Sequence, residues 1–365
     1  MSFESPKSKI YIVGTMRTGS SVFTNMLNAH SEIMVLGECI HFFRFIYKYY
    51  EPLNRENIER MLKEMYARIY WRYKLNVDVE EILKDIDSSG YNYRAIYEAI
   101  MRFYLKKLGK VIAGEDVALH WTKIPEFLRL FPEAKIIQIY RDPRSIVASW
   151  GKASYQKSDY LISIFNCLDN FDKCSYYSKY LPKENYLLVR YEDSILAPEK
   201  MARKLCDFVG VDFEPLMIQP EKWDDIFDGV YVKRGWSSHT GKKHKGFDPS
   251  RIDIWKDSLQ DWELCLCEWL AKDRMKEFGY ELSGRKFDVD TISKGIDILR
   301  KSPMLNRCHT AWLTLNHGWE GYANDPRDPG TWGTVGKNKE LFIHTKDGKE
   351  YLKAMEEIKD KYRGG

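Results

Sequence analysis

At 365 residues the chain is long enough for one large α/β domain with insertions or for two smaller domains, and it can bury a full core. Hydrophobic residues make up 44% of it and charged residues 30%, a composition typical of a folded globular protein and not of a disordered one. The 57 basic and 53 acidic side chains leave a net charge of only +4, so the overall charge gives no reason to expect a nucleic acid or a membrane as partner.

The cysteines and the hydropathy of the sequence indicate where the protein is located and whether it binds a metal or a membrane. The seven cysteines are odd in number, dispersed and set mostly in apolar patterns, which predicts reduced, packed thiols and a cytoplasmic location. The sequence has no CxxC pair, and its histidines lack companions at zinc-ligand spacing, so we expect no metal site. Because no signal-peptide core and no run of 18 apolar residues occurs, we expect neither export nor membrane anchoring.

The first elements along the chain predict a strand, a tight loop and a helix. Residues 10–13 form a short apolar run closed by Gly14, and apolar residues at helical spacing follow over residues 22–27. Residues 41–110 are rich in tyrosine and carry apolar stripes at helical spacing. We expect this segment to be a helical insertion that packs over a sheet and forms the acceptor side of the site.

The β/α pattern returns after the insertion. Residues 135–140 predict a buried strand, and Asp142 and Pro143 are suited to begin the helix after it. Residues 186–189 predict a further strand, followed by a helix over residues 198–209 that ends at Gly210. Alternating β and α units predict an α/β fold with a central parallel sheet flanked by helices.

The loop after the first strand has the glycine spacing of a phosphate loop. Gly14 and Gly19, with four residues between them, allow backbone N–H groups and the next helix N-terminus to surround an anion. A nucleotide-hydrolysing enzyme needs a lysine where Ser20 stands, together with a bound Mg²⁺ and a distant carboxylate. The strand at residues 135–140 is followed by Arg141 and not by such a carboxylate, so the loop fits a 5′-phosphate carrying one sulfuryl group better, with Arg17 supplying the charge.

A second anion-binding element follows a later strand. Arg141 stands at the expected carboxyl end of its strand, and Ser149 lies eight residues on, along the next helix. In an open α/β sheet, ligands bind at that edge. Two separate anion elements indicate a nucleotide with phosphates at two places and not in one chain.

In these features the sequence resembles the sulfotransferases that use 3′-phosphoadenosine 5′-phosphosulfate (PAPS). Their 5′-phosphate loop commonly reads GxPRSGTT, and residues 14–21 read GTMRTGSS. Their 3′-phosphate element is an arginine followed by a serine eight residues later, like Arg141 and Ser149. The similarity extends to NAHS at 28–31, GE at 37–38, KIP at 123–125 and RYED at 190–193, the last followed by a helix ending in FVG at 208–210. It covers residues 9–40 and about 112–280, and it leaves the helical insertion and the tail unmatched.

The resemblance implies a P-loop-like sulfotransferase fold and in-line transfer of a sulfuryl group from PAPS to a hydroxyl or amine of a small-molecule acceptor, with PAP as product. The sulfotransferase domain is expected over residues 1–282, and residues 283–365 are expected to be a C-terminal extension packed on the same domain. Met16 replaces the usual proline of the loop, and two serines replace threonines while keeping the hydroxyls.

The resemblance also assigns the donor site. Arg17, the backbone of residues 18–21 and the hydroxyls of the loop are expected at the 5′-phosphosulfate, and Arg141 and Ser149 at the 3′-phosphate. Tyr191 resembles a position near the adenine, although a core tyrosine after a strand explains it equally well. Lys245 and Gly246 resemble a basic loop that closes over the nucleotide, and a solvated basic turn is the alternative. The expected cofactor-binding residues are therefore Arg17, Thr18, Gly19, Ser20, Ser21, Arg141, Ser149, Tyr191, Lys245 and Gly246.

Three residues are candidates for the base that takes the acceptor's proton. Glu38 resembles the glutamate that serves as base in tyrosylprotein and several bacterial members, and a capping or salt-bridged glutamate is the alternative. His41 and His120 compete for the role, because cytosolic hormone-type members use a histidine near a Lys-Pro element like that at 123–125. Lys123 is expected to assist the leaving phosphate.

Two rival functions stay open. One is a small-molecule kinase with a degenerate phosphate loop, which would bind ATP with magnesium. The other is a catalytically inactive nucleotide-binding module, which would bind PAP without turnover. The sequence identifies neither the acceptor nor the oligomeric state.

Overall fold

The computed structural model of the chain describes residues 8–37, 40–73, 77–153, 159–225 and 246–302. Five parallel strands form one sheet in the order β2-β3-β1-β4-β5. The strands are β1 (Lys9–Gly14), β2 (Ile33–Gly37), β3 (Ile112–Asp116), β4 (Lys135–Tyr140) and β5 (Tyr186–Arg190). This arrangement confirms the predicted α/β fold with a central parallel sheet flanked by helices, and it places all five carboxyl ends at one edge.

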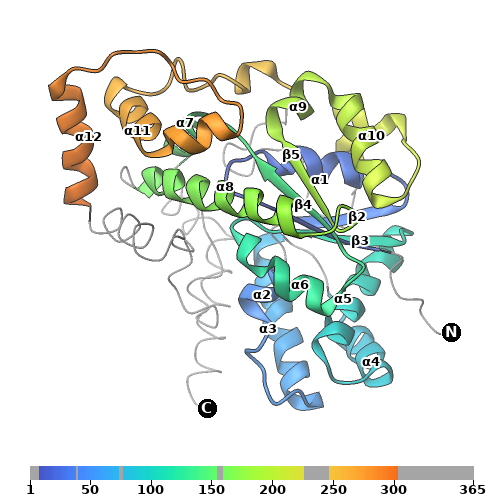
Figure 1. Ribbon diagram of the computed structural model, residues 1–365. Helices are drawn as coiled ribbons and strands as arrows, with labels where there is room; N and C mark the ends of the chain where they lie inside the picture. The colour runs from blue at the N-terminus through green and yellow to red at the C-terminus, as the bar shows by residue number, and fades with distance from the viewer. Residues whose placement is uncertain (1–7, 38–39, 74–76, 154–158, 226–245, 303–365) are drawn as a thin grey trace, which may run out of the picture.

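Helices cover both faces of the sheet (Figure 1). The α-helices are α1 (Ser20–Asn28), α2 (Phe42–Phe45), α3 (Arg55–Tyr73), α4 (Val79–Ser89), α5 (Tyr93–Leu108), α6 (Ile124–Leu130), α7 (Pro143–Ala153), α8 (Ile162–Tyr180), α9 (Tyr191–Leu196), α10 (Pro198–Val209), α11 (Asp261–Glu277) and α12 (Val289–Lys301). Short 3₁₀ turns include η1 (His120–Lys123), η3 (Pro215–Ile218), η4 (Pro220–Asp225) and η5 (Pro249–Arg251).

The side chains of β1 alternate between two cores, as the period of a strand requires. Ile10 and Ile12 pack with α1 and α10 on one face, whereas Tyr11 and Val13 pack with the helices of the insertion on the other. A strand buried on both faces reads as a continuous apolar run, which is why residues 10–13 were identifiable from the sequence.

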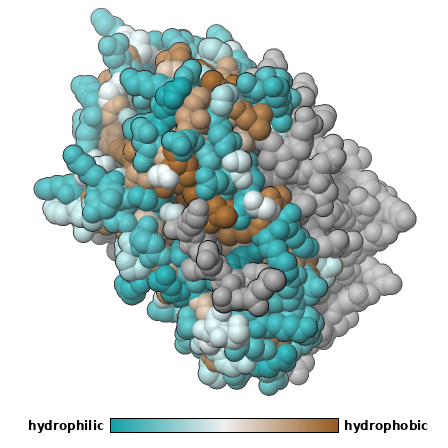
Figure 2. Space-filling model, turned by 90° about the vertical axis from the view of Figure 1, so that its right-hand side faces the viewer, coloured by the Kyte–Doolittle hydropathy of each residue, from teal (hydrophilic) through white to brown (hydrophobic). Residues whose placement is uncertain are grey.

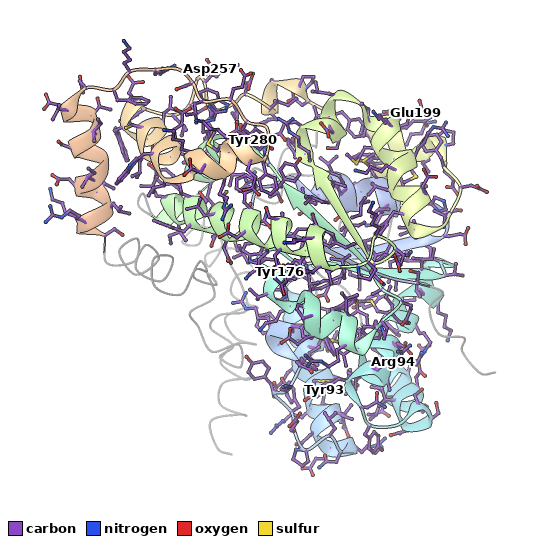
Figure 3. The ribbon with its side chains drawn as sticks, viewed as in Figure 1. Tyr93, Arg94, Tyr176, Glu199, Asp257 and Tyr280 are labelled. Atoms are coloured by element: carbon purple, nitrogen blue, oxygen red, sulfur yellow. The ribbon has the colours of Figure 1, made fainter. Side chains whose placement is uncertain are left out.

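Helices α2 to α5 form the predicted insertion, which lies below the sheet in Figure 1. Asp78 accepts a hydrogen bond from the backbone of Glu81 and caps α4, and Asn92 caps α5 in the same way. The apolar stripe of α3 is buried in the core on this side of the sheet, as its helical spacing predicts, and α3 packs against α4. Tyr93 and Arg94, labelled in Figure 3, are the first two residues of α5.

Other predicted boundaries agree with the structure. Asp142 accepts a hydrogen bond from the Arg144 N–H at 2.9 Å, so it caps α7, in which Pro143 is the first residue. Gly210 adopts a left-handed conformation (φ 88°) and ends α10.

The strands β2 and β3 were not predicted from the sequence. Each has only five residues, and β3 reads IAGED, in which two carboxylates at the end break the apolar pattern although both are buried. Burial of Glu115 and Asp116 places polar groups at the edge where ligands of such sheets bind.

Residues beyond 282 contribute one further helix to the described structure. Helix α12 packs against α11, where the backbone of buried Gly295 approaches Trp262 and Leu266. The remainder of the expected C-terminal extension, residues 303–365, lies outside the described residues, so the predicted domain boundaries stay predictions.

The described helices include none that is both long and apolar enough to cross a membrane. The face of the molecule in Figure 2 exposes hydrophobic side chains between hydrophilic ones.

Gly114 in β3 tests how tightly the sheet is packed. A Cβ there would lie 2.9 Å from Ile10 Cβ and 3.1 Å from Val35 Cγ2, so we expect Gly114→Ala to lower the free energy of unfolding by about 1–3 kcal/mol. Gly295→Ala is the control, because its Cβ would meet no atom closer than 3.4 Å and alanine favours a helix by up to about 1 kcal/mol. Denaturant unfolding of both variants checks this, and equal effects would contradict the packing.

Candidate functional site

The loop between β1 and α1 is a tight turn held by its own groups. Arg17 (φ 70°) and Gly19 (φ 89°) both adopt the left-handed conformation. The Thr18 hydroxyl and N–H both donate to the carbonyl oxygen of Thr15, at 2.9 and 3.2 Å. A Cβ at Gly14 would lie 2.9 Å from Thr18 Oγ1, so the loop leaves room only for glycine there. The buried Thr18 hydroxyl therefore fixes the loop's shape.

Helix α1 begins directly at this loop, with Gly19 as its N-cap. No side chain caps the helix, and its first turn contains no acidic residue. Its first N–H groups and the positive end of its dipole are therefore suited to an anion. Ser20 is half-buried and Ser21 is exposed at this position.

Arg141, which follows β4, links the loop to two other elements. Its Nη1 donates to the Arg17 carbonyl oxygen at 2.9 Å, and its Nη2 donates to the Arg251 carbonyl oxygen at 2.5 Å. Its guanidinium lies 4.2 Å from the centre of the Tyr191 ring, a cation–π contact. Within the described ranges, its buried Nε has no hydrogen-bond partner.

Arg17 meets the second predicted anion element directly, because its Nε donates to the Ser149 hydroxyl at 3.1 Å. The Tyr191 ring packs so closely on the loop that a Cβ at Gly19 would lie 2.2 Å from it. Arg17, Arg141, Ser149, Gly19 and Tyr191 therefore come together at the carboxyl edge of the sheet.

The electrostatics of this cluster favour a bound anion. Burial, followed by the positive charges of Arg141 and Arg251, lowers the pKa of Arg17 to about 10. Among the residues that the structure describes, neither Arg17 nor Arg141 forms an ion pair with a carboxylate, although Arg251 lies 3.5 Å from Asp248. An anion placed between these guanidinium groups would relieve their mutual repulsion.

A second polar group lies at the ends of β2 and β3. His41 and His120 are both buried, with ring centres 6.2 Å apart, and the Tyr11 hydroxyl lies 3.1 Å from His120 Nδ1. Glu115 accepts a hydrogen bond from the Phe42 N–H at 3.2 Å. The predicted histidine candidates are therefore neighbours, on the insertion side of the sheet edge.

Asp116 connects the two sides of the edge. It lies at the end of β3 and accepts a hydrogen bond at 3.0 Å from the hydroxyl of Thr24, in the helix that follows the phosphate loop. Both groups are buried.

The turn that carries His120 and Lys123 is anchored from α8. Trp121 Nε1 donates to Asp169 at 2.6 Å, and the Tyr177 hydroxyl donates to the Trp121 carbonyl oxygen at 2.9 Å. Lys123 ends this turn, half-buried, at the start of α6.

Some predicted site residues fall elsewhere. Glu38 and Lys245 lie outside the described residues. Gly246 adopts a left-handed conformation (φ 68°), and a Cβ there would lie 2.4 Å from Pro220 Cγ, so its backbone packs against η4.

Sequence reasoning missed Arg251, whose carbonyl oxygen and charge both belong to the arginine cluster. It also missed the buried carboxylates Glu115 and Asp116. No motif marks Arg251, but Asp116 would follow from recognising β3 and the edge at which it ends. In the described part of the chain, no cluster of three or more His, Cys, Asp or Glu residues is arranged to hold a metal ion.

The burial of Arg17 beside other positive charges predicts an unusual effect on stability. Because its pKa in the folded protein lies below its usual value, the charged form costs stability at every pH below about 10. We expect Arg17→Met to raise the unfolding free energy at pH 7 by about 1 kcal/mol, after the loss of its bond to Ser149.

The control is Arg203→Met, which breaks an exposed pair with Glu199 on α10 and should change stability by less than about 1 kcal/mol. Thermal and denaturant unfolding without added anions measure both. A clear loss of stability in Arg17→Met would show that the cluster is not electrostatically strained.

Comparison with known proteins agrees with this geometry. Residues 9–215 match the model of the sulfotransferase family. The chain is 28% identical over 212 residues to carbohydrate sulfotransferase 3 of Tetronarce californica (52% of this chain, 44% of the relative). It is 24% identical over 246 residues to protein-tyrosine sulfotransferase of Drosophila melanogaster (62% of this chain, 42% of the relative). The chain thus spans less than half the length of either relative.

Two solved structures share the fold. The sulfotransferase domain from the curacin biosynthetic pathway has a TM-score of 0.52 and 20% identity, covering 76% of this chain and all of that one. The sulfotransferase domain of the Synechococcus PCC 7002 olefin synthase has a TM-score of 0.51 and 19% identity, covering 77% of this chain and 98% of that one. Because the family model matches more than half of the sequence, including the phosphate loop and the Arg141–Ser149 element, this chain belongs to the sulfotransferase family.

Proposed function

We propose that this chain transfers a sulfuryl group from PAPS to a hydroxyl or amine of a small-molecule acceptor and releases PAP. The observation that carries the proposal is the meeting of Arg17 and Arg141 at the N-terminus of α1, without a carboxylate to neutralise them among the described residues. Such a cluster is suited to a ligand with more than one anionic group.

We assign the two anionic ends of the donor to the two elements. Arg17 and the first N–H groups of α1 face the 5′-phosphosulfate, with the hydroxyls of Ser20 and Ser21 beside it. Arg141 and Ser149 hold the 3′-phosphate. We place the adenine near Tyr191, whose buried ring contacts both Arg141 and the Gly19 loop. Lys245 and Gly246 remain candidates for a loop that closes over the nucleotide.

The residues around the donor act mainly by positioning and by charge. PAPS supplies an activated sulfuryl group, whose bond to the phosphate oxygen breaks as the acceptor forms a new bond to sulfur. Arg17 and Lys123 stabilise the negative charge that develops on the departing phosphate oxygen. A base removes the acceptor's proton in the same step. The tight loop holds the reacting groups in line.

The base belongs to the other side of the edge. Glu38 follows β2 directly in the sequence. His41 and His120 belong to the buried polar group at the ends of β2 and β3. We propose Glu38 as the base, because of its resemblance to the glutamate of tyrosylprotein sulfotransferases, with the two histidines as alternatives.

The curated relatives bear on the acceptor by their names alone, one a carbohydrate and the other a protein-tyrosine sulfotransferase. Sugars and tyrosines both offer a hydroxyl group, which supports a hydroxyl acceptor more than an amine. The cytoplasmic location inferred from the cysteines stays a prediction.

Binding of PAP tests the donor site. We expect calorimetry to show PAP binding that EDTA does not change, and Arg141→Ala to weaken it by at least about tenfold, since a charge-assisted contact contributes about 1.5–3 kcal/mol. Arg203→Ala, which removes an exposed arginine from α10, is the matched control and should bind like the wild type. Preferential binding of ATP with Mg²⁺ would contradict the proposal and favour the kinase alternative.

Turnover tests the base. With an acceptor chosen by screening phenols, sugars and amines with PAPS, Glu38→Gln should lower kcat by about 10²–10⁴-fold while PAP still binds. Full activity in Glu38→Gln, together with loss of activity in His41→Ala or His120→Ala, would move the role to a histidine. PAP binding without turnover for any acceptor would instead support an inactive nucleotide-binding module.

A further inference from the structure

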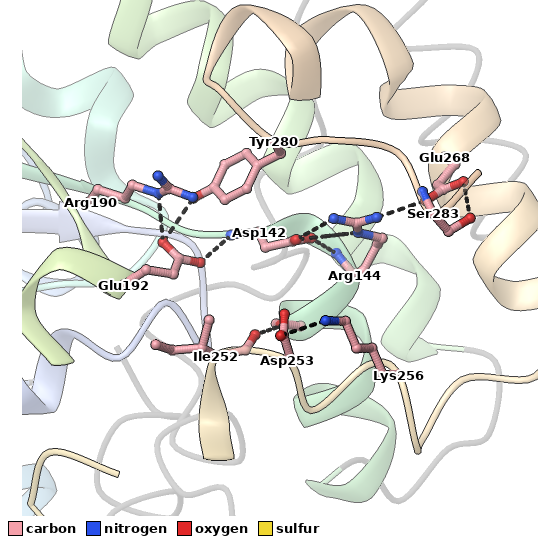
Figure 4. Close-up of polar contacts among 11 residues, drawn as sticks. Asp142, Arg144, Arg190, Glu192, Ile252, Asp253, Lys256, Glu268, Tyr280 and Ser283 are labelled. Atoms are coloured by element: carbon pink, nitrogen blue, oxygen red, sulfur yellow. Dashed lines mark hydrogen bonds and ion pairs between the residues drawn. The ribbon is translucent and has the colours of Figure 1, made fainter. Parts of the chain in front are cut away.

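Behind the arginine cluster, a buried carboxylate joins three segments of the chain. Glu192 is 3% exposed and stands in the first turn of α9. Its Oε1 accepts from the Asp142 N–H at 3.0 Å, and its Oε2 accepts from Arg190 Nε at 3.2 Å and from the Tyr280 hydroxyl at 2.9 Å (Figure 4). The carboxylate is thus held from the turn after β4, from β5 and from the segment after α11.

The hydrogen bond between Glu192 and Asp142 joins residues that directly follow two residues of the anion site. Asp142 directly follows Arg141, and Glu192 directly follows Tyr191. Arg141 and Tyr191 form the cation–π pair that faces the anion site. The hydrogen bond therefore fixes the distance between the two backbones that carry this pair.

The contacts of Glu192 with Asp142, Arg190 and Tyr280 form a junction, to which Tyr280 contributes from a distant part of the chain. It is 4% exposed and lies inside the molecule close to α8 and α11 (Figure 3). The Arg190 guanidinium lies 4.5 Å from the centre of its ring. Tyr280 stands beyond residues 9–215, so the part of the chain that matches the family model does not contain the whole junction.

A second buried junction holds the same loop from its other side. Arg144 donates to Asp142 at 2.7 Å and to Glu268 on α11 at 2.7 Å, and its guanidinium lies 4.0 Å from the Trp255 ring. Glu268 also accepts from the N–H and the hydroxyl of Ser283, at 2.7 and 2.9 Å. The segment after α11 is therefore tied to the loop at two points.

We propose that Glu192 and Tyr280 are positioning residues, which hold the Arg141–Tyr191 pair in the geometry that binds the donor's 3′-phosphate and base. This inference rests on the proposed function for the identity of the ligand, and on the contacts above for the junction itself. The Tyr280 hydroxyl orients the Glu192 carboxylate, which in turn accepts a hydrogen bond from the Asp142 N–H. This bond fixes the backbone next to Arg141 and thereby the direction of the Arg141 side chain. Because guanidinium hydrogen bonds depend on direction, a small rotation of this loop would weaken phosphate binding.

The test compares Tyr280→Phe with Tyr160→Phe. Both remove one buried tyrosine–glutamate hydrogen bond, but the Tyr160 hydroxyl donates to Glu263 of α11 and not to Glu192, which holds the Asp142 N–H. Two measurements are made on each variant: hydrogen exchange of residues 141–149 without nucleotide, and calorimetric titration with PAP. Glu192→Gln, which keeps the shape of the side chain and removes its charge, is the second variant.

For Tyr280→Phe we expect faster exchange in residues 141–149 and PAP binding weakened by about three- to tenfold. We expect KM for PAPS to rise with kcat nearly unchanged, a split that a general loss of stability would not produce. Tyr160→Phe should match the wild type in exchange of this segment and in affinity.

The remaining outcomes separate the two claims. Unchanged exchange of residues 141–149 in both Tyr280→Phe and Glu192→Gln would overturn the junction, whatever the titration shows. Faster exchange with PAP affinity equal to that of the wild type would overturn the positioning role. If the wild type binds no PAP but exchange still rises in Tyr280→Phe, the junction stands and the proposed function fails.

Discussion

The packing of two arginines against each other, partly shielded from solvent, is the constraint on which the rest of this site depends. Arg17 and Arg141 meet at the carboxyl edge of a parallel sheet, where burial and like charge lower the pKa of Arg17 to about 10. They are held there by backbone carbonyl groups, by the Ser149 hydroxyl and by the face of Tyr191, and not by carboxylates of the described chain. Groups of this kind fix the positions of the arginines without neutralising them, so the positive charge stays available to a ligand.

The strand order places the arginine cluster and the buried polar group of β2 and β3 on opposite sides of the phosphate loop. The phosphate loop follows the central strand β1, with Arg141 on the β4 side and the buried polar groups of β2 and β3 on the other. In the proposed function, a nucleotide on the β4 side and an acceptor under the helical insertion would meet above β1, beside Arg17. The hydrogen bond from Thr24 to Asp116 connects α1, which follows the phosphate loop, to the end of β3 on the acceptor side of the proposed site.

Much of the fold and half of the site could be predicted from the sequence because the signals are local. The glycine spacing identifies the loop, and the strand at residues 135–140 places Arg141 at a sheet edge with Ser149 on the following helix. By contrast, β2 and β3 are too short to show a clear period, and buried carboxylates at the end of β3 disguise it. Arg251 and Tyr280 reach the site only through tertiary packing, so no pattern near them in the sequence indicates their position.

The central claim is that the two arginines hold the two phosphate-bearing ends of one nucleotide. A crystal structure of the protein with PAP tests this most directly. The account predicts the 5′-phosphate against Arg17 and the N-terminus of α1, the 3′-phosphate against Arg141 and Ser149, and the adenine beside Tyr191. PAP bound away from the arginine cluster, or both phosphates on one arginine with the other facing solvent, would contradict it.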